Sequence, residues 1–543
     1  MHFPSSFPVG VFRACRLRHL LAWSLFAGGL TLGWADDSAA AGGTIFITEY
    51  RVAGVRMLPR IAVEEAVYPY LGPGRTRDDI EAARAALEAA YQANGFQTVG
   101  VQVPAQPLAD GVIRLQVVER KVGRLRVKGA KYSSPKKIKE AAPSLAEGTV
   151  IDFNQVPKDI VALNQSADRA VTPSLRAGAE PDTVDVDLEV KEKAPLHASV
   201  ELNNRRGPDT TPLRLTTSVS AGNIAQSGNS AGLSFQGSPQ ETSQVKVYSG
   251  YYIQRFAGAD WFSLMASATK QDSNVSTLGD TAVAGRGKSA LLRANFNLPG
   301  ADGFFHSAGV TLNYKHFDQK LDLPASGSTP ASVVVTPVTY WPLEGSYSAT
   351  WQNKKATTEF NAAVAFHVRG LGSDTAEFGN NRYKADANFL IFRGDLARTQ
   401  ELPVGLQLFG KVQGQLSDQP LLSGEQASGG GQGTVRGYLE SEAVGDSGVF
   451  GTLELRSPSL LARVKTFPGE WRFFAFTDTG WLKVSNPLPE QKNHFDFLSW
   501  GLGSRVRLLD HFDGTIAASM PVLQVGKTKA QDWRILFKAA LDY

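Results

Sequence analysis

Two short motifs in this chain of 543 residues have the spacing of known chemical sites. Residues 282–289, AVAGRGKS, resemble a phosphate-binding loop with alanine in place of the first glycine. That chemistry requires a following helix to hold the phosphate, but the next residues alternate apolar and polar and predict a strand. Residues 228–232, GNSAG, match G-x-S-x-G at a short turn between predicted strands, where a nucleophile elbow needs a strand-to-helix turn. Neither motif predicts a catalytic residue.

Metal, cofactor and nucleic-acid chemistry are also predicted to be absent. The 8 histidines form no HExxH motif and no i, i+4 pair, and the net charge of +4 is too small for a nucleic-acid binder. The single cysteine, Cys15, lies in a stretch where three arginines precede an apolar run. This stretch predicts a signal peptide over residues 1–35, which leaves a short segment, 36–43, before the first domain. We therefore predict no enzyme, no metal and no cofactor.

The third candidate is an ion pair between a glycine-rich segment and a predicted strand. The segment reads GGGQG at residues 429–433 and continues with Val435, Arg436, Gly437 and Tyr438. In the strand, WRFFAFTDTGW at residues 471–481, side chains alternate between two faces, and one face carries Phe476, Asp478 and Gly480. A guanidinium and a carboxylate can form a bidentate pair in a partly dry site. Whether Arg436 reaches Asp478 depends on the elements that carry them.

Those elements belong to a long β region that begins at residue 195. Segments of about ten residues have a period of two, and the connections are mostly long after odd-numbered segments and short after even ones. This pattern predicts a 16-stranded antiparallel transmembrane β-barrel over residues 195–543, with a soluble β domain as the alternative. The sixteen strands are expected to begin near residues 196, 212, 229, 243, 260, 286, 304, 338, 356, 384, 404, 447, 470, 496, 512 and 532.

Two α+β modules are predicted ahead of the barrel. Residues 44–119 have the order β-α-α-β-β, with Thr76 as the N-cap of the second helix. Residues 120–194 repeat that order, with helices expected at 135–142 and 155–170 and strands at 174–177 and 183–190. Two tandem copies of one module suggest a docking arm rather than a catalytic domain.

The longest connection, residues 419–446, contains the arginine. From residue 418 to Arg436 the extended chain reaches about 60 Å, at ~3.3 Å per residue, whereas the apolar band of a barrel is ~25 Å tall. The loop can therefore fold back into the lumen, which Asp478 faces if Trp471 faces lipid. From spacing alone, a solvated lumen charge is the simpler interpretation of Asp478.

The motifs of the loop, of the strand and of the second module resemble those of a known family, and this resemblance covers the mature chain. GTVRGYLESEAVGDSGVFGTLELRSP, FTDTG and LRAGAEPDTVDVDLEV resemble the outer-membrane transporters of two-partner secretion. These are the TpsB class, or ShlB/FhaC/HecB-type hemolysin secretion/activation proteins, of the BamA-related superfamily. The resemblance implies that Arg436 contacts Asp478 beside Phe476, and that residues 44–119 and 120–194 are POTRA domains. One departure is Asp182, which stands where the family usually has glycine.

The resemblance further implies a function. We expect a pore that recognises an unfolded, TpsA-like partner protein in the periplasm and secretes it across the outer membrane without nucleotide hydrolysis. A BamA-like or TamA-like assembly factor is the alternative, and a diffusion porin would lack the docking arm. The other expected partners are outer-membrane lipid and, during biogenesis, the barrel assembly machinery, with a monomeric barrel. Residues 36–43 are too few for a plug helix, so the loop is expected to close the pore.

Overall fold

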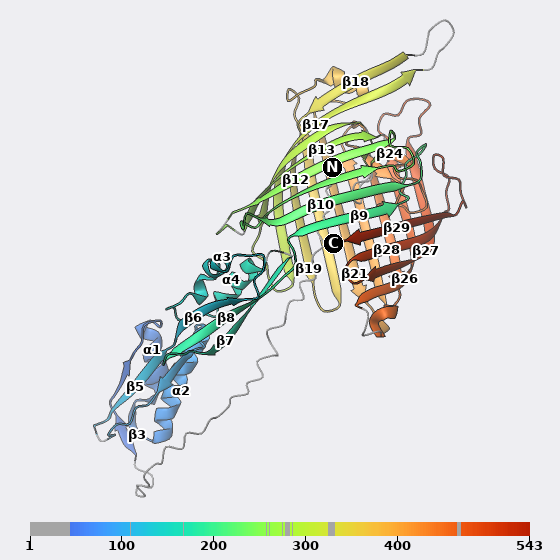
Figure 1. Ribbon diagram of the computed structural model, residues 1–543. Helices are drawn as coiled ribbons and strands as arrows, with labels where there is room; N and C mark the ends of the chain where they lie inside the picture. The colour runs from blue at the N-terminus through green and yellow to red at the C-terminus, as the bar shows by residue number, and fades with distance from the viewer. Residues whose placement is uncertain are drawn as a thin grey trace. The chain divides into compact units, whose positions relative to one another are not determined.

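The protein consists of two structural units that divide between Pro195 and Leu196 (Figure 1). The computed structural model describes residues 44–543 apart from 109, 165, 167, 257, 260, 274, 277–282, 285, 324–331 and 464–467. The predicted signal peptide, 1–35, and the segment 36–43 lie outside the described residues. None of the described helices is long and apolar enough to cross a membrane.

The first N-terminal module is a three-stranded sheet covered by helices. Its sheet has the order β2 (Glu49–Ala53), β5 (Val112–Glu119), β4 (Val99–Gln102), and β2 runs parallel to β5. A short pair, β1 (Ile45–Ile47) with β3 (Gly72–Arg75), lies beside it, and the helices are α1 (Arg60–Val67) and α2 (Arg77–Ala93). Helix α2 begins at Thr76 because the Thr76 hydroxyl and the Asp79 carboxylate form a capping box. Its apolar face buries Leu87 and Tyr91 in the module's core.

The second module repeats this arrangement, but its second helix ends earlier than residue 170 and the strand after it begins earlier than residue 174, the positions expected from the sequence. Its sheet has the order β6 (Lys121–Lys128), β8 (Thr183–Glu192), β7 (Arg169–Ala177), and its helices are α3 (Pro135–Glu140) and α4 (Val156–Leu163). The helix expected over 155–170 ends early because the Asn164 side chain pairs with Val171, accepting from its N–H at 2.6 Å and donating to its C=O at 3.0 Å. Asp182, in the β7–β8 turn, has a φ of 55°, which favours glycine.

The second unit is a closed antiparallel barrel in which β29 pairs with β9. Its 16 strands agree with the prediction because β18 and β19 are consecutive parts of one strand, interrupted at Pro342, and both pair with β17. The strands are β9 (Leu196–Asn203), β10 (Arg214–Ile224), β11 (Asn229–Gly237), β12 (Val245–Arg255), β13 (Phe262–Ser273), β16 (Gly287–Asn297), β17 (Phe304–Leu323), β18 (Ser332–Tyr340), β19 (Leu343–Gln352), β20 (Ala356–His367), β21 (Phe389–Glu401), β22 (Gln407–Ser417), β25 (Ser447–Arg456), β26 (Gly469–Lys483), β27 (His494–Leu508), β28 (Phe512–Pro521) and β29 (Arg534–Asp542).

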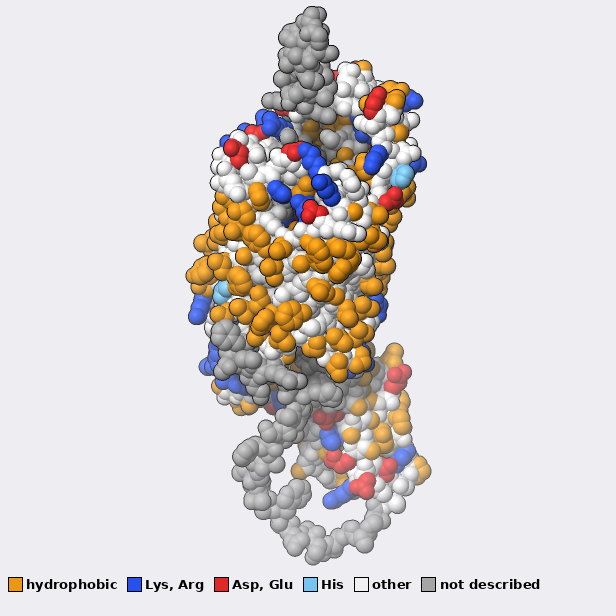
Figure 2. Space-filling view, turned by 90° about the vertical axis from the view of Figure 1, so that its right-hand side faces the viewer, with side chains coloured by type: hydrophobic (Ala, Val, Ile, Leu, Met, Phe, Trp, Pro, Cys, Tyr) orange, Lys and Arg blue, Asp and Glu red, His pale blue; other side chains and the backbone are white. Residues whose placement is uncertain are grey.

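The barrel wall alternates between a lipid-facing side and a lumen side. Strand β26 is the clearest example, because Trp471, Phe473 and Trp481 are exposed whereas Phe476 and Asp478 are buried. Figure 2 shows the result on one face of the molecule, where hydrophobic side chains form a broad band and charged side chains gather beyond its edges. This band is the surface that a bilayer would cover.

The two motifs that resemble enzyme sites lie on barrel strands. Ser230, the serine of GNSAG, lies on strand β11, and the end of AVAGRGKS opens strand β16, so no described helix follows either motif directly. The geometry required for a nucleophile elbow or a phosphate loop is therefore absent from the described residues there.

Candidate functional site

The connection between β22 and β25 folds back on itself and lies against the inner wall. Its two limbs pair as a short hairpin, β23 (Ala427–Gly429) with β24 (Ala443–Gly445). The tip between these strands carries the VRGY segment, in which Val435, Arg436 and Tyr438 are buried. A loop this long holds one conformation only if its polar groups find partners, and the partners are on the wall.

Arg436 is attached to the wall by three side-chain hydrogen bonds. Its guanidinium binds Asp478 of β26 in a bidentate fashion, with Nε to Oδ2 at 2.7 Å and Nη2 to Oδ1 at 2.8 Å. Its third donor, Nη1, binds Glu454 Oε2 of β25 at 2.6 Å. The backbone N–H of Arg436 also donates to Asp478 Oδ2, at 3.0 Å. Since Arg436, Asp478 and Glu454 are only 6%, 1% and 2% exposed, water screens these contacts little.

Glu454 is a site residue that the sequence analysis missed. Its second oxygen, Oε1, accepts from Arg456 Nε at 2.8 Å, so two arginines and two carboxylates form one charge-balanced cluster. The signal was present in the sequence: Glu454 and Arg456 share the inward face of the LELR strand. Period two places residues on a face, but it does not show that Glu454 lies opposite Phe476 of β26, two residues along the strand from Asp478.

The other residues of the strand motif shape the surface that the arginine occupies. The Phe476 ring lies beneath the guanidinium, with its centroid 3.5 Å from Arg436 Cζ, which is cation–π stacking distance. Gly480 leaves space for the loop, because a Cβ there would come within 2.4 Å of Phe450 and 3.1 Å of Val435. The structure thus brings together the predicted residues of the loop and of β26.

Tyr438 attaches the tip at a second point. Its hydroxyl lies 2.8 Å from the carbonyl oxygen of Leu523 and 3.0 Å from that of Leu498, and its ring packs edge-on against Phe497 at 5.0 Å. Gly437, between the two anchors, has a φ of 96°, which a residue with a side chain rarely adopts. This turn directs Arg436 toward β25 and β26 and Tyr438 toward β27.

Buried carboxylates anchor the rest of the loop. Glu440 accepts from Arg205 Nε at 3.0 Å, and Arg205 follows β9. Glu442 accepts from the N–H groups of Lys527 and Thr528, after β28, at 2.6 and 3.2 Å. Sequence patterns do not reveal these anchors, because each anchor joins segments far apart in the chain.

At the base of the loop, Asp446 accepts from the N–H groups of Leu421 and Ser485 and from Arg382 Nη2, at 2.7 to 2.9 Å. Arg382 follows α5 (Thr375–Asn381), a short helix in the connection between β20 and β21. Asp446 is fully buried, so the aspartate of the G-D-x-G motif serves to fix the point where the loop rejoins the wall.

The first limb has an ionic contact on a different part of the wall. Glu425 forms an ion pair with Lys315 of β17, accepts from Arg393 Nη2 of β21 at 3.0 Å, and accepts from the Tyr340 hydroxyl at 2.9 Å. An apolar cluster that includes Phe378, Leu421 and Leu422 packs beside it. The loop is therefore held on both β17–β21 and β25–β28, so it bridges the lumen.

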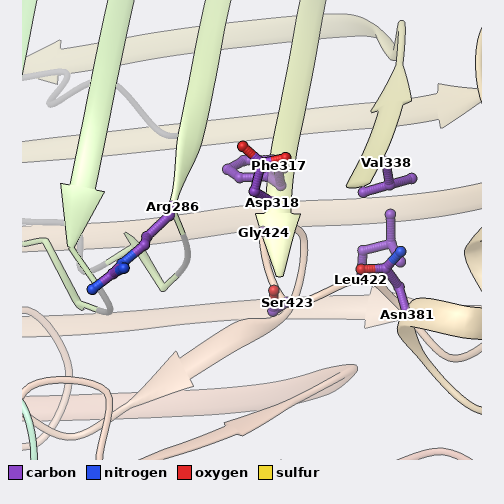
Figure 3. A pocket seen from close by; sticks show the side chains of 8 residues that line it. All are labelled: Arg286, Phe317, Asp318, Val338, Asn381, Leu422, Ser423 and Gly424. Atoms are coloured by element: carbon purple, nitrogen blue, oxygen red, sulfur yellow. The ribbon is translucent and has the colours of Figure 1, made fainter. Parts of the chain in front are cut away.

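A small cavity lies where the first limb passes β17 and β18 (Figure 3). Its volume of about 40 Å³ is enough for one or two water molecules but not for a substrate or cofactor. Within the described residues, no group of three or more His, Cys, Asp and Glu side chains is placed to hold a metal ion. The lining residues are Arg286, Phe317, Asp318, Val338, Asn381, Leu422, Ser423 and Gly424.

Fold and site together define an outer-membrane β-barrel with a POTRA-type domain at its N-terminus. The family model for haemolysin secretion/activation protein ShlB/FhaC/HecB matches residues 182–506, more than half of the chain, and the model for the ShlB-type POTRA domain matches residues 45–120. The chain belongs to the haemolysin secretion/activation family, a family of two-partner secretion transporters. Its barrel is an outer-membrane barrel, and its POTRA region is periplasmic, which confirms the recognised family, the fold class and the location.

Solved structures show the same fold at low sequence identity. CdiB from Escherichia coli aligns with a TM-score of 0.65 and 16% identity, covering 94% of this chain and 93% of that one. CdiB from Acinetobacter baumannii aligns with a TM-score of 0.56 and 14% identity, covering 93% and 91%. BamA from Haemophilus ducreyi lacking POTRA domains 1-3 has a TM-score of 0.54 and 12% identity, covering 92% and 100%. A comparison with curated protein sequences finds no match.

Proposed function

We propose that this protein is the pore through which an unfolded partner protein leaves the periplasm, with the loop of residues 419–446 as its gate. The observation that carries the proposal is the seating of Arg436 on Asp478 and Glu454 inside the wall. A loop held across the lumen by buried ionic contacts must move before a polypeptide passes. The positive and negative charges of these contacts balance, and the bidentate contact has a specific geometry, so the closed position of the loop is well defined.

The two α+β modules would capture the client. Residues 44–119 and 120–194 each contain a three-stranded sheet. The central strand is β5 in the first module and β8 in the second. The outer strands therefore offer edges to which an extended client segment can add by β-augmentation. Energy for transit would come from folding of the client outside the cell, since nothing in the proposal requires nucleotide hydrolysis.

An assembly factor that opens its barrel between the first and last strands is the competing function. The seam between β9 and β29 argues against an assembly factor, because hydrogen bonds close this seam at both ends. At one end the N–H and C=O groups of Ala198 and Tyr543 bond reciprocally, at 2.8 and 3.1 Å. At the other, the Asn204 side chain donates to Ile535 O at 2.7 Å and accepts from Phe537 N–H at 2.9 Å.

Two experiments test the proposal. Arg436→Ala should nearly abolish appearance of a co-expressed partner protein in the medium, while the barrel keeps its heat-modifiable migration on gels. Normal export from this variant would remove the loop from the mechanism.

The second experiment separates export from lateral opening. Glu201 and Ala540 face each other across the seam, and Cys15 is the only native cysteine, so a cysteine pair at these positions can be joined by a short bifunctional crosslinker that alkylates thiols. Export through the closed lumen should survive the crosslink. Loss of export only after crosslinking would favour lateral opening instead.

A further inference from the structure

Two lysines face each other on the outer surface of the barrel wall. Lys270 of β13 and Lys288 of β16 are directly opposite in the strand register. Both are exposed, and the residues next to them on the inward face, such as Ser289, are buried. The row continues on both sides, because Tyr248 of β12 is opposite Lys270 and His316 of β17 is opposite Lys288.

The charges of this pair are not compensated within the part of the chain that the structure describes. Like charges directly opposite on a sheet are destabilising, and neither lysine has an ion-pair partner among the described residues. The nearest acid on β13, Asp272, is engaged by Arg286 at 3.3 Å, and Asp318 lies 3.5 Å from His316 Nε2. An anion outside the chain would therefore stabilise the pair.

The position of the lysines indicates the kind of anion. The POTRA region is periplasmic, so β9 runs outward and, by alternation, β13 ends and β16 begins at the extracellular end of the barrel. Two residues closer to the periplasm on each of the four strands, the next outward-facing side chains are small or aromatic. Two residues further, the outward-facing side chains are apolar. The first set is Gly250, Ala268, Ala290 and Tyr314, and the second is Tyr252, Ala266, Leu292 and Leu312.

The Tyr314 ring also packs against the ring of Trp341 at a tilt, with centroids 4.8 Å apart, and these are the amphipathic aromatic side chains expected where a bilayer meets water. The lysines thus lie at the outer boundary of the apolar band, at the depth of lipid headgroups in the outer leaflet. Basic side chains at that depth recognise lipid phosphates.

We propose that Lys270 and Lys288, with Tyr248 beside them, bind the phosphate groups of a phosphorylated outer-leaflet glycolipid, the lipopolysaccharide class. The two ammonium groups would share the phosphate, and the Tyr248 hydroxyl lies next in the row as a further hydrogen-bonding group. The His316 ring is already engaged, because its Nδ1 lies 2.7 Å from Thr339 Oγ1 and its Nε2 lies 3.5 Å from Asp318. The small side chains beneath the lysines leave the wall open to an acyl chain. This site goes beyond export, and it depends on the outer-membrane location rather than on the gate.

The experiment uses the full-length protein in detergent, with purified lipid A as the probe and native mass spectrometry to count bound lipid. The variant Lys270→Gln/Lys288→Gln should bind lipid A roughly 25-fold more weakly, from about fivefold for each basic side chain at a membrane surface. The matched control is Lys354→Gln/Lys355→Gln, which removes the same charge from the exposed turn between β19 and β20. It should bind lipid A like the unaltered protein.

Three outcomes would overturn the proposal. They are equal binding by both double variants, equal binding of lipid A stripped of its phosphates, and displacement of lipid A by millimolar inorganic phosphate, which would indicate a free-anion site. Heat-modifiable gel migration checks that each variant has assembled. If the double variant does not assemble, Lys288→Gln alone should lower the affinity about fivefold, and an unchanged affinity would count against the site.

Discussion

Replacing Arg436 by lysine tests whether geometry, and not charge alone, holds the loop in its seat. The substitution keeps the positive charge and most of the side-chain length. The guanidinium, however, presents three donors to two carboxylates, on Asp478 and Glu454, and its Cζ lies 3.5 Å from the centroid of the Phe476 ring. A single ammonium nitrogen cannot occupy all three donor positions.

The expected magnitude follows from these contacts. Lysine would lose about two charge-assisted hydrogen bonds, each contributing about 1.5 to 3 kcal/mol. The seated loop should therefore be destabilised by at least about 3 kcal/mol relative to the released loop, which is about 150-fold in their ratio. Loss of stacking on Phe476 would add to this effect.

Single-channel recording in planar bilayers measures that ratio as the time spent in the high-conductance state divided by the time spent in the closed state. Arg456→Lys is the matched control, because Arg456 gives Glu454 one hydrogen bond, at 2.8 Å, which lysine can replace. We expect the ratio of open to closed time to rise about 150-fold in Arg436→Lys and to change little in Arg456→Lys. Equal open fractions in the two variants would refute the role assigned to the bidentate contact.

Three further outcomes follow from the structure. Deleting residues 425–440 should raise the single-channel conductance, and an unchanged conductance would show that another element closes the pore. Glu425→Gln should weaken the attachment of the first limb of the loop by about 3 kcal/mol, because it leaves Lys315 buried without an anion and Arg393 with only Glu344, 3.7 Å away, and limited proteolysis of the limb measures this. The hydrogen bond from Lys128 lowers the pKa of Asp187 in the folded second module. The ionised carboxylate therefore stabilises the folded module above the ordinary pKa of 3.8, and this stabilisation is lost as the pH falls through the lower folded-state pKa. The protection factors of the β6 and β8 amides, which compare the observed exchange rates with the intrinsic rates at each pH, should therefore fall below about pH 4 in the unaltered protein, and Asp187→Asn should weaken this pH dependence.

The sequence predicted the barrel strands well because their pattern is local. Each strand alternates between lipid and lumen, and this alternation is set by residues two apart, as in β26. The end of α4 was placed too late for the opposite reason. Helical periodicity continues past Leu163, but the side chain of Asn164 pairs with Val171 and starts β7, and that competing contact has no periodic signature.

The site could be predicted only in part. Gly437 and Tyr438 belong to a recognisable motif, whereas the partners of the loop lie far away in the chain. Glu440 and Arg205 are 235 residues apart, and Glu425 and Lys315 are 110 residues apart. No periodicity relates such residues, because their contact depends on how the barrel closes and where the loop crosses it.

The ionic contacts of Arg436 explain how the loop can have a specific position and still be released. Burying Arg436 with Asp478 and Glu454 costs desolvation energy that offsets much of their attraction, so the net stability of the seated loop is small although its position is specific. Moving a two-state gate from 1% to 99% open requires about 5.5 kcal/mol of differential binding. A client held along the sheet edges of the two modules by several backbone hydrogen bonds, each worth about 1 kcal/mol, can supply energy of that order only if those bonds favour the open state. The proposed gate therefore requires a client whose binding to the modules is linked to loop release, and a client that binds equally to both states would not open it.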